Sequence, residues 1–489
     1  MSLKYKEILE YIDKGPYSAD WSSLTDWQMP EWFTEAKFGI FIHWGLYSVP
    51  AFANEWYSRN MYVKDSPEYK HHIETYGEHA RFGYKDFIPM FKAENFDPEY
   101  WAEVFAQSGA RYVVPVAEHH DGFQMYESDL SKYNATQMGP HKDVIGLLKQ
   151  SVEKRGLIFG TSTHRIEHCW FMGVGREFKS DIHEPLKKGD FYWPSRAEQP
   201  DFSDLNSKPD PTAEFLIDWV ERTCEIVDRY SPRMLYFDWW IQHISAKPYL
   251  RTIAAYYYNR GVEQGYPTAI SYKHDAMAFG SAIVDVERGK FASAKPYHWQ
   301  TDTAIARNSW CYTTSLQYKS AEEIICYLAD VVAKNGNLLL NVGPKSDGTF
   351  AGEDLSILLD IGEWLKVNGE AIYGSKPWRY AEEGPTKEVE GQFSDGSATA
   401  YTSRDIRFTC GNGAIYAIIL KCPESGHVHI SSIARSEDSS KPFFHGVVKR
   451  VSILGYDEDE DFTLDKIGLH FQHRGLRSRL PIVVKIETE

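Results

Sequence analysis

The chain has 489 residues, of which 43% are hydrophobic and 25% charged, and its mean hydropathy is -0.46. That composition is typical of a globular protein with two or three domains and argues against extensive disorder. The formal net charge of -16 repels phosphate backbones and anionic lipid surfaces, so nucleic acid and membranes are not expected partners.

The first 15 residues have an amphipathic pattern rather than the apolar block of a signal peptide. No stretch of about 18 apolar residues follows that would span a bilayer. The six cysteines show neither a CxxC pair nor zinc-binding spacing, which favours a reducing compartment. We therefore expect a cytoplasmic protein, and the sequence leaves open whether it forms a homo-oligomer.

Between about Phe38 and Pro344, short apolar runs alternate with longer amphipathic segments. Continuous apolar runs indicate strands buried on both faces, as in parallel sheets. The runs are "FGIFIHWG", "RYVVPVAEHHDGF", "GLIFGTSTH", "MLYFDWW", "TAISYKHD" and "NLLLNVGP"; the candidate helices include "PEYWAEVFAQSGA", "DVIGLLKQSVEKRG" and "TAEFLIDWVERTCEIVDRY". This alternation predicts an α/β fold with a (β/α)8-like, TIM-type barrel over residues 1–374, and a doubly wound sheet is the alternative.

After "DLSILLDIGEWLKVNGEAIYG", which predicts a closing helix, the pattern changes. Short strand-like runs follow without helices between them: "ATAYTSRDIRFTC", "AIYAIILKC", "HVHISSI", "VVKRVSIL" and "LPIVVKIE". These runs predict a C-terminal antiparallel β-sandwich over residues 375–489.

The strand ends carry the candidate chemistry, because functional side chains of a barrel gather at the carboxyl ends of its strands. The polar and aromatic residues there are His43, Trp44, Glu118, His119, His120, Asp121, Asp238, Trp299 and Asp302. Aromatic residues make up 15% of the chain, with 15 Trp and 31 Tyr, and flat amphipathic rings of this kind suit carbohydrate binding.

Hydrolysis of a glycosidic bond needs one carboxylate at the anomeric carbon and a second group that protonates the leaving oxygen. Asp238 is the candidate for the first role. Glu287, expected in the loop region after the "TAISYKHD" strand, is the candidate for the second, with Asp285 and Glu263 as competitors.

Two histidine motifs offer metal-binding alternatives. "HRIEH", residues 164–168, matches the H-x-x-E-H zinc motif, but that motif needs a helix and here it follows a strand-like run. In "HHD", adjacent histidines on extended chain point in opposite directions, which disfavours a shared ion and favours hydrogen bonds to sugar hydroxyls. A zinc hydrolase is therefore the remote alternative.

Three motifs in order resemble the signature blocks of glycoside hydrolase family 29, the retaining α-L-fucosidases. They are "WFTEAKFGIFIHWGLYSVPAFANEWY", "EHHDGFQMYESDLSKYNA" and "NLLLNVGPKSDGTF…WLKVNGEAIYGSKPW", and the similarity spans about Trp32 to Trp378. The resemblance implies a catalytic barrel followed by a β-sandwich, in agreement with the pattern of the runs.

The resemblance also implies roles for individual residues. Asp238 stands at the family's nucleophile position, and Glu287 resembles the "ERG" form of the acid/base. The residues implied to bind the sugar or its leaving group are His43, Glu55, Trp56, His119, His120, Trp299 and Trp310. Where many relatives have a tyrosine after the third strand, His164 or Glu167 stands here, and Lys273 takes the place of a basic sugar ligand.

The resemblance predicts an exo-α-L-fucosidase that acts on fucosylated oligosaccharides through a covalent fucosyl-enzyme, without metal or organic cofactor. The two carboxyl groups should then lie about 5–5.5 Å apart, with the pKa of Glu287 above that of Asp238. The alternatives are an α-L-galactosidase-like exo-glycosidase on the same scaffold and a catalytically inactive fucose-binding protein.

Overall fold

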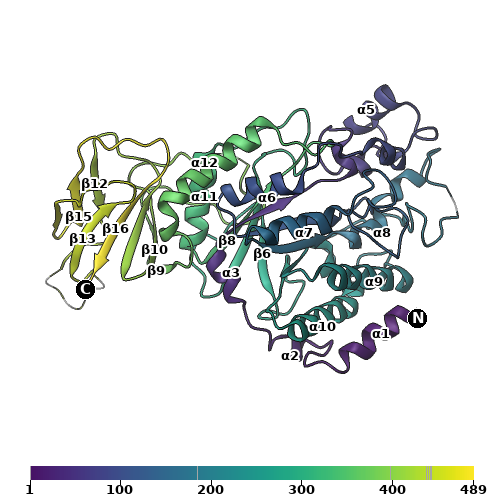
Figure 1. Ribbon diagram of the computed structural model, residues 1–489, viewed down its shortest axis with the longest axis horizontal. Helices are drawn as coiled ribbons and strands as arrows, with labels where there is room; N and C mark the ends of the chain where they lie inside the picture. Colours follow the sequence, from purple (N-terminus) through teal and green to yellow (C-terminus); the bar gives the residue numbers. More distant parts are fainter. Residues whose placement is uncertain (1, 184, 397, 437, 439, 441–442) are drawn as a thin grey trace.

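The computed structural model describes residues 2–183, 185–396, 398–436, 438, 440 and 443–489. Its larger part is a closed barrel of parallel strands in the order β1 to β8, and helices surround it (Figure 1). The strands are β1 (Phe38–Ile42), β2 (Tyr112–Glu118), β3 (Ile158–Thr163), β4 (Met234–Phe237), β5 (Ala269–Tyr272), β6 (Ile283–Glu287), β7 (Trp299–Ala304) and β8 (Gly336–Val342). Since β1 pairs with β8 in parallel, the predicted barrel is confirmed and the doubly wound sheet is wrong.

The helices begin where the sequence provides capping side chains. Asp97, Asp143 and Thr212 accept hydrogen bonds from backbone N–H groups of the first turns of α6, α7 and α9. The α-helices are α1 (Leu3–Ile12), α2 (Trp21–Leu24), α3 (Glu31–Ala36), α4 (Tyr57–Asn60), α5 (Pro67–Tyr76), α6 (Pro98–Gln107), α7 (Val144–Lys154), α8 (His168–Phe171), α9 (Ala213–Tyr230), α10 (Lys247–Gln264), α11 (Ala321–Ala333) and α12 (Gly352–Asn368). Short 3-10 helices are η1 (Leu46–Ser48), η2 (Tyr84–Met90), η3 (Arg165–Glu167), η4 (Gly173–Arg176), η5 (Trp239–Gln242), η6 (Ile244–Ala246) and η7 (Gly369–Ala371). None of the helices in the described part of the chain is both long and apolar enough to cross a membrane.

Strands β6 and β7 have no continuous apolar run, because several of their buried side chains are polar. Asp285 accepts a hydrogen bond from Gln300 inside the barrel, at 2.7 Å. Glu287 is the last residue of β6 and pairs in register with Asp302 of β7. The expectation that Glu287 lies in a loop is therefore wrong, since a strand holds it.

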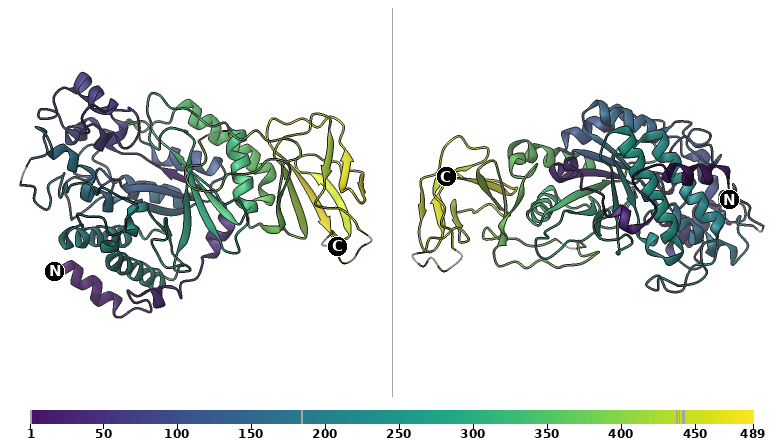
Figure 2. Two further views of the ribbon diagram at one scale, coloured as in Figure 1. Left: turned by 180° about the vertical axis from the view of Figure 1, so that it is seen from behind. Right: turned by 90° about the horizontal axis from the view of Figure 1, so that it is seen from below.

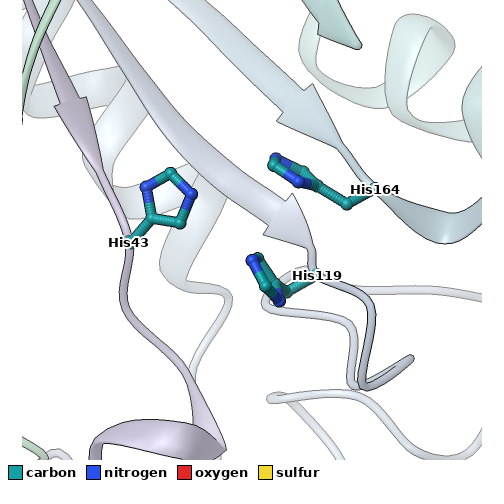
Figure 3. A group of neighbouring side chains, drawn as sticks. All are labelled: His43, His119 and His164. Atoms are coloured by element: carbon teal, nitrogen blue, oxygen red, sulfur yellow. The ribbon is translucent and has the colours of Figure 1, made fainter. Parts of the chain in front are cut away.

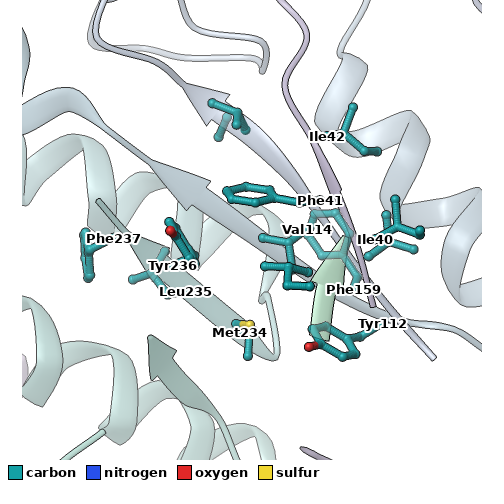
Figure 4. Packing of buried hydrophobic residues seen from close by; sticks show 14 of the residues in the cluster. Ile40, Phe41, Ile42, Tyr112, Val114, Phe159, Met234, Leu235, Tyr236 and Phe237 are labelled. Atoms are coloured by element: carbon teal, nitrogen blue, oxygen red, sulfur yellow. The ribbon is translucent and has the colours of Figure 1, made fainter. Parts of the chain in front are cut away.

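Aromatic and aliphatic side chains pack on both faces of the barrel strands (Figure 4). The rings of Phe41 and Tyr236 lie 4.8 Å apart, centroid to centroid. Below them Tyr112 lies across the interior and donates a hydrogen bond to Gln300, at 3.0 Å. Gly39 leaves room for that ring, because a Cβ at this position would lie 2.5 Å from it. The interior is thus closed, and functional groups can gather only at the strand ends.

The second part of the chain forms two antiparallel sheets, which lie beyond α11 and α12 (Figure 2). One sheet has the order β13-β16-β11-β10-β9 and the other β12-β15-β14. The strands are β9 (Lys376–Glu383), β10 (Ile406–Gly411), β11 (Ala414–Ile419), β12 (His427–Ile430), β13 (Val448–Ile453), β14 (Phe462–Leu464), β15 (Leu469–Gln472) and β16 (Ile482–Thr488). The predicted C-terminal antiparallel sheets are confirmed.

Strand β11 joins the two parts through its alternating side chains. Ile415 and Ile419 belong to the core between the two sheets, whereas Tyr416 and Ile418 belong to the core that is continuous with the barrel. Burial on both faces explains why this strand reads as a continuous apolar run. The predicted boundary after residue 374 falls between η7 and β9.

Candidate active site

A cavity of about 410 Å³ opens at the carboxyl ends of the barrel strands. Its volume is in the range of roughly 300–1,000 Å³ that is usual for small-molecule sites. The residues that line it are Phe41, His43, Glu55, Trp56, His119, His120, His164, Tyr236, Asp238, Trp239, Lys273, His274, Glu287, Asp302, Trp310 and Phe393. Thus every site residue that the sequence predicts lies in this wall, except Trp299.

Trp299 is the first residue of β7, so it lies at the opposite end of the strand from the cavity. Its indole N–H donates to the backbone oxygen of Lys334, and its ring packs against Phe291. The prediction of a leaving-group contact for Trp299 is therefore wrong, because Trp299 begins the strand at whose carboxyl end the sequence places it. Trp310, from the same stretch, does line the cavity.

Lys273 connects the two candidate carboxylates. Its ammonium nitrogen lies 3.3 Å from Oδ1 of Asp238 and 2.8 Å from Oε2 of Glu287. It also lies 3.3 Å from Oδ2 of Asp302. Two oxygens that contact one nitrogen at 3.3 and 2.8 Å lie closer together than the roughly 6.5 Å at which inverting separations begin.

Asp238 is held by several donors at once. The Trp239 backbone N–H donates to Oδ1, at 2.8 Å, and rings of two histidines reach Oδ2: His164 at 3.2 Å and His120 at 3.4 Å. Burial raises the pKa of this carboxyl, but Lys273, then His164 and His120, outweigh burial and hold its pKa well below the usual range. Asp238 is therefore a carboxylate at neutral pH.

The environment of Glu287 has the opposite effect. Burial raises its pKa, Lys273 lowers it, and the negative charges of Asp238 and Asp302 raise it again, so that the pKa is about 7. Glu287 is thus substantially protonated near neutrality while Asp238 is ionised. Two carboxyl groups whose environments separate their pKa values in this way provide an acid and a nucleophile in one site.

Three histidines from neighbouring strand ends, His43, His119 and His164, come together in the cavity (Figure 3). His43 is oriented by Asn341 of β8, whose side-chain oxygen lies 2.7 Å from Nδ1. Burial, and then the neighbouring histidines, hold the pKa of His43 and of His119 well below the usual range. Neutral imidazoles both donate and accept, and so match the hydrogen-bonding capacity of sugar hydroxyls.

The sequence predicts that His119 and His120 point in opposite directions, and this prediction is wrong. Strand β2 ends at Glu118, so the two histidines lie beyond the extended chain, and their ring centroids are 4.2 Å apart. Within the described residues, two trios have ligand atoms within 4.8 Å of one another and could hold a metal ion: His43, His119 and His164, and His120, His164 and Asp238. Both trios lie inside the cavity that a sugar would fill.

The "HRIEH" motif is divided between two environments. His164 faces the cavity, whereas His168 contacts the backbone oxygens of His120 and Phe191. Glu167 lies 3.4 Å from Nδ1 of His120 and raises the pKa of that ring against the effect of burial. His164 therefore occupies the cavity, and Glu167 supports a neighbouring histidine from behind.

Glu55 and two tryptophans complete the wall. The backbone N–H of Trp310 donates to Oε2 of Glu55, at 3.0 Å. The Trp310 ring lies 5.1 Å from that of His43, and the Trp56 ring lies 5.8 Å from that of His120. The cavity wall thus combines aromatic rings with polar histidine and carboxylate groups.

The other acidic candidates lie outside the cavity wall. Glu263 is exposed on α10 and pairs with Arg260, while Asp285 is buried below Glu287. Glu118 lies 3.1 Å from Arg222, and Asp121 accepts a hydrogen bond from Tyr84. Of the three candidates for the acid role, Glu287, Asp285 and Glu263, Glu287 is the one that lines the cavity.

Six lining residues were absent from the predicted set: Phe41, Tyr236, Trp239, His274, Asp302 and Phe393. Tyr236 precedes Asp238 by two positions, and that alternation could have placed its side chain on the same face. Asp302 lies at a predicted strand end, but no sequence pattern predicts a role for it. Nothing in the sequence connects Phe393, which follows β9, with a site built by the barrel.

A closed parallel barrel with two carboxyl groups of separated pKa at its carboxyl end, beside a histidine-lined cavity, is the arrangement of a glycoside hydrolase. A sequence model described as alpha-L-fucosidase matches residues 7–370. The chain belongs to the alpha-L-fucosidase family and is an α-L-fucosidase.

Similar proteins cover nearly the whole chain. The tissue alpha-L-fucosidase of Rattus norvegicus is 32% identical over 456 residues, which are 92% of this chain and 87% of that protein. The human tissue enzyme is 33% identical, over 85% of this chain and 81% of its own. The crystal structure of Thermotoga maritima alpha-fucosidase in complex with fucose is 30% identical, with a TM-score of 0.73, and the match covers 96% of this chain and all of that one (100%).

Proposed function

We propose that this α-L-fucosidase removes terminal α-L-fucosyl residues from fucosylated oligosaccharides with retention of configuration. The observation that carries the proposal is the bridge from Lys273 to both carboxyl groups. The carboxyl oxygens of Asp238 and Glu287 that Lys273 contacts lie closer together than inverting separations, and the pKa of Glu287 lies above that of Asp238. The fucose complex of the Thermotoga maritima enzyme supports fucose as the sugar in the cavity.

The reaction proceeds in two displacements. In the first, a carboxylate oxygen of Asp238 attacks the anomeric carbon while Glu287 gives its proton to the departing oxygen, and a covalent fucosyl-enzyme forms. In the second, the Glu287 carboxylate takes a proton from water and the water oxygen attacks the anomeric carbon. The bond between the anomeric carbon and the Asp238 oxygen then breaks. Two inversions give net retention, and no step draws on a metal or an organic cofactor.

The histidines and aromatic rings orient the sugar for this attack. His43 and His119 bind sugar hydroxyls as neutral donors and acceptors of hydrogen bonds. Glu55 accepts a hydrogen bond from a further hydroxyl. The C6 methyl group lies against aromatic rings of the wall such as Trp56. An added hydroxyl at C6, as in α-L-galactose, is rejected by such an apolar wall by only about 100-fold.

The test of the proposal is the configuration of the first product. Proton NMR of an aryl α-L-fucoside during rapid hydrolysis should show α-L-fucose first, followed by its mutarotation to the β anomer. A parallel sample of α-L-fucose of known age gives the rate of mutarotation under the same conditions. If β-L-fucose appears first, the enzyme inverts and the double displacement is wrong.

Lys273→Met is expected to move both limbs of the pH profile of kcat/KM to higher pH. The acid limb reports ionisation of Asp238 and the basic limb loss of the proton from Glu287. Lys273 lowers both pKa values, so both rise when the ammonium is removed. An adjacent opposite charge is worth about one to three pKa units.

The matched control for this prediction is Lys273→Arg, which keeps the positive charge. Its limbs should stay close to those of the wild type even where its activity falls. Profiles of an aryl α-L-fucoside over the stable pH range compare the three proteins. Limbs that do not move in Lys273→Met would show that the ammonium does not set the two pKa values.

A further inference from the structure

The segment of residues 388–395, which follows β9, lies beside the catalytic acid at the barrel. The backbone N–H of Phe393 donates to the backbone oxygen of Glu287, at 2.9 Å. The N–H of Asp395 donates to Arg288, at 3.1 Å, and that of Gly391 to Lys290, at 3.1 Å. The segment thus runs along the chain that follows β6.

Buried ion pairs hold the segment at both ends. Asp395 is buried, and one of its oxygens lies 2.8 Å from Nζ of Lys319 and 3.5 Å from Arg288. At the other end the Glu388 carboxylate lies 2.7 Å from Lys290 and 2.9 Å from Arg407 of β10. Buried, paired charges of this kind fix one arrangement of the chain, because separating them leaves an uncompensated charge.

Gly289 makes this close approach possible. A Cβ at position 289 would lie 1.8 Å from the backbone oxygen of Gly391 and 2.9 Å from Cα of Gln392. Any larger residue would push the segment away from Glu287. The glycine of the "ERG" sequence therefore has a role in this chain: it admits the returning segment directly behind the catalytic acid.

The segment presents Phe393 at the mouth of the cavity. The ring lines the cavity, yet 63% of the residue is exposed to solvent. Its backbone has a φ of +54°, a left-handed conformation that a bulky residue rarely adopts. Buried ion pairs on both sides of Phe393 hold this strained backbone in place. Packing does not explain why the aromatic ring that it carries is exposed.

We propose that Phe393 forms the platform on which the leaving group of the substrate stacks. The inference rests on the proposed function, because it takes Glu287 as the acid that protonates the departing oxygen. The leaving group must then lie on the Glu287 side of the fucosyl ring. Phe393, whose N–H donates to the backbone oxygen of Glu287, places an exposed ring on that side.

This position also defines a class of leaving group. A flat aromatic face stacks well on the C–H face of a pyranose ring or on an aryl ring, and poorly on an acyclic alcohol. The substrates whose leaving group stacks on Phe393 are therefore fucosides of another pyranose, such as a galactose or an N-acetylglucosamine unit. Fucosides with an acyclic or very small leaving group do not make this contact.

The experiment compares two leaving groups in Phe393→Ala. For fucosyl-galactose and fucosyl-N-acetylglucosamine disaccharides, kcat/KM should fall about tenfold, the usual worth of an aromatic contact. For α-L-fucosyl fluoride, whose leaving group is a single atom, kcat/KM should stay at the wild-type value. Phe393→Trp, which keeps a flat ring, should restore cleavage of the disaccharides.

A matched control is Phe279→Ala, since Phe279 is 65% exposed and packs on Tyr297 away from the cavity wall. That variant should cleave all substrates like the wild type. If Phe393→Ala lost the same fraction of kcat/KM on the fluoride and on the disaccharides, the segment would have a structural role only and the proposal would be wrong. The proposal would also be wrong if kcat/KM fell on neither substrate. If the wild type does not hydrolyse the fluoride, the proposed function itself fails.

Discussion

Asp238→Gly is expected to abolish turnover of an aryl α-L-fucoside, and added azide is expected to restore it with β-L-fucosyl azide as the product. Loss of a covalent nucleophile lowers kcat by at least about 10⁴-fold in comparable hydrolases. The glycine leaves a space beneath the anomeric carbon that a small anion can enter. Azide attacks from that face while Glu287 still protonates the leaving group, so one inversion replaces two.

The geometry makes this rescue possible. Removing the Asp238 carboxylate leaves Lys273 with Glu287 and Asp302 as partners, at 2.8 and 3.3 Å, so the ammonium is not left unpaired. His120 likewise keeps its contact with Glu167. Lys273 and His120 therefore each keep a carboxyl partner, and circular dichroism should show a folded variant.

Asp238→Asn is the matched control for the glycine variant. The amide has nearly the size of the carboxylate, so it removes the nucleophile and yet fills the space. This variant should be inactive, and azide should not rescue it. The role of Asp238 would be refuted by an active Asp238→Gly enzyme, or by azide rescue that gives the α-azide.

The sequence predicts the barrel wherever strands are apolar on both faces, and fails where they are not. The runs that become β1 to β5 and β8 are continuous, because the barrel interior and the helices bury them. Strands β6 and β7 place Asp285, Gln300 and Asp302 inside, where they bond to one another or to Lys273. Such polar strands look like loops until their partners are known.

The candidate site shows the same division. Residues that follow predicted strands, such as His43 and Asp238, lie in the cavity because strand ends converge there. Trp299 fails because an aromatic cluster does not reveal at which end of a strand it lies. The sequence does not predict the position of Phe393, since that position depends on ion pairs made by Asp395 and Glu388.

Glu287→Gln is expected to separate the two halves of the reaction. Turnover of a natural fucosyl disaccharide should fall by about 10²–10⁴-fold, the usual worth of general acid–base catalysis. A fucoside of dinitrophenol needs little protonation, so it should still form the fucosyl-enzyme. Without a base to activate water, that intermediate should accumulate, and a burst of dinitrophenol should precede slow turnover.

Azide distinguishes this variant from the nucleophile variant by the anomer that it forms. In Glu287→Gln the azide attacks the fucosyl-enzyme without the help of a base, so the product is α-L-fucosyl azide after two inversions. In Asp238→Gly the same reagent gives the β anomer. The basic limb of the pH profile, set by a pKa of about 7 for Glu287, should also disappear from kcat/KM for the dinitrophenyl substrate.

Two neighbouring carboxyl groups provide the controls for Glu287. Asp285 lies two positions before Glu287 on β6, outside the cavity wall. The Asp285→Asn variant should show neither a burst nor an azide product. Asp302→Asn loses a partner of Lys273 and should alter the pH profile, again without an azide product. If Asp302→Asn gave the burst and the α-azide while Glu287→Gln did not, the acid would be Asp302. That exchange would also move the leaving group away from Phe393, because the platform is tied to the backbone of Glu287.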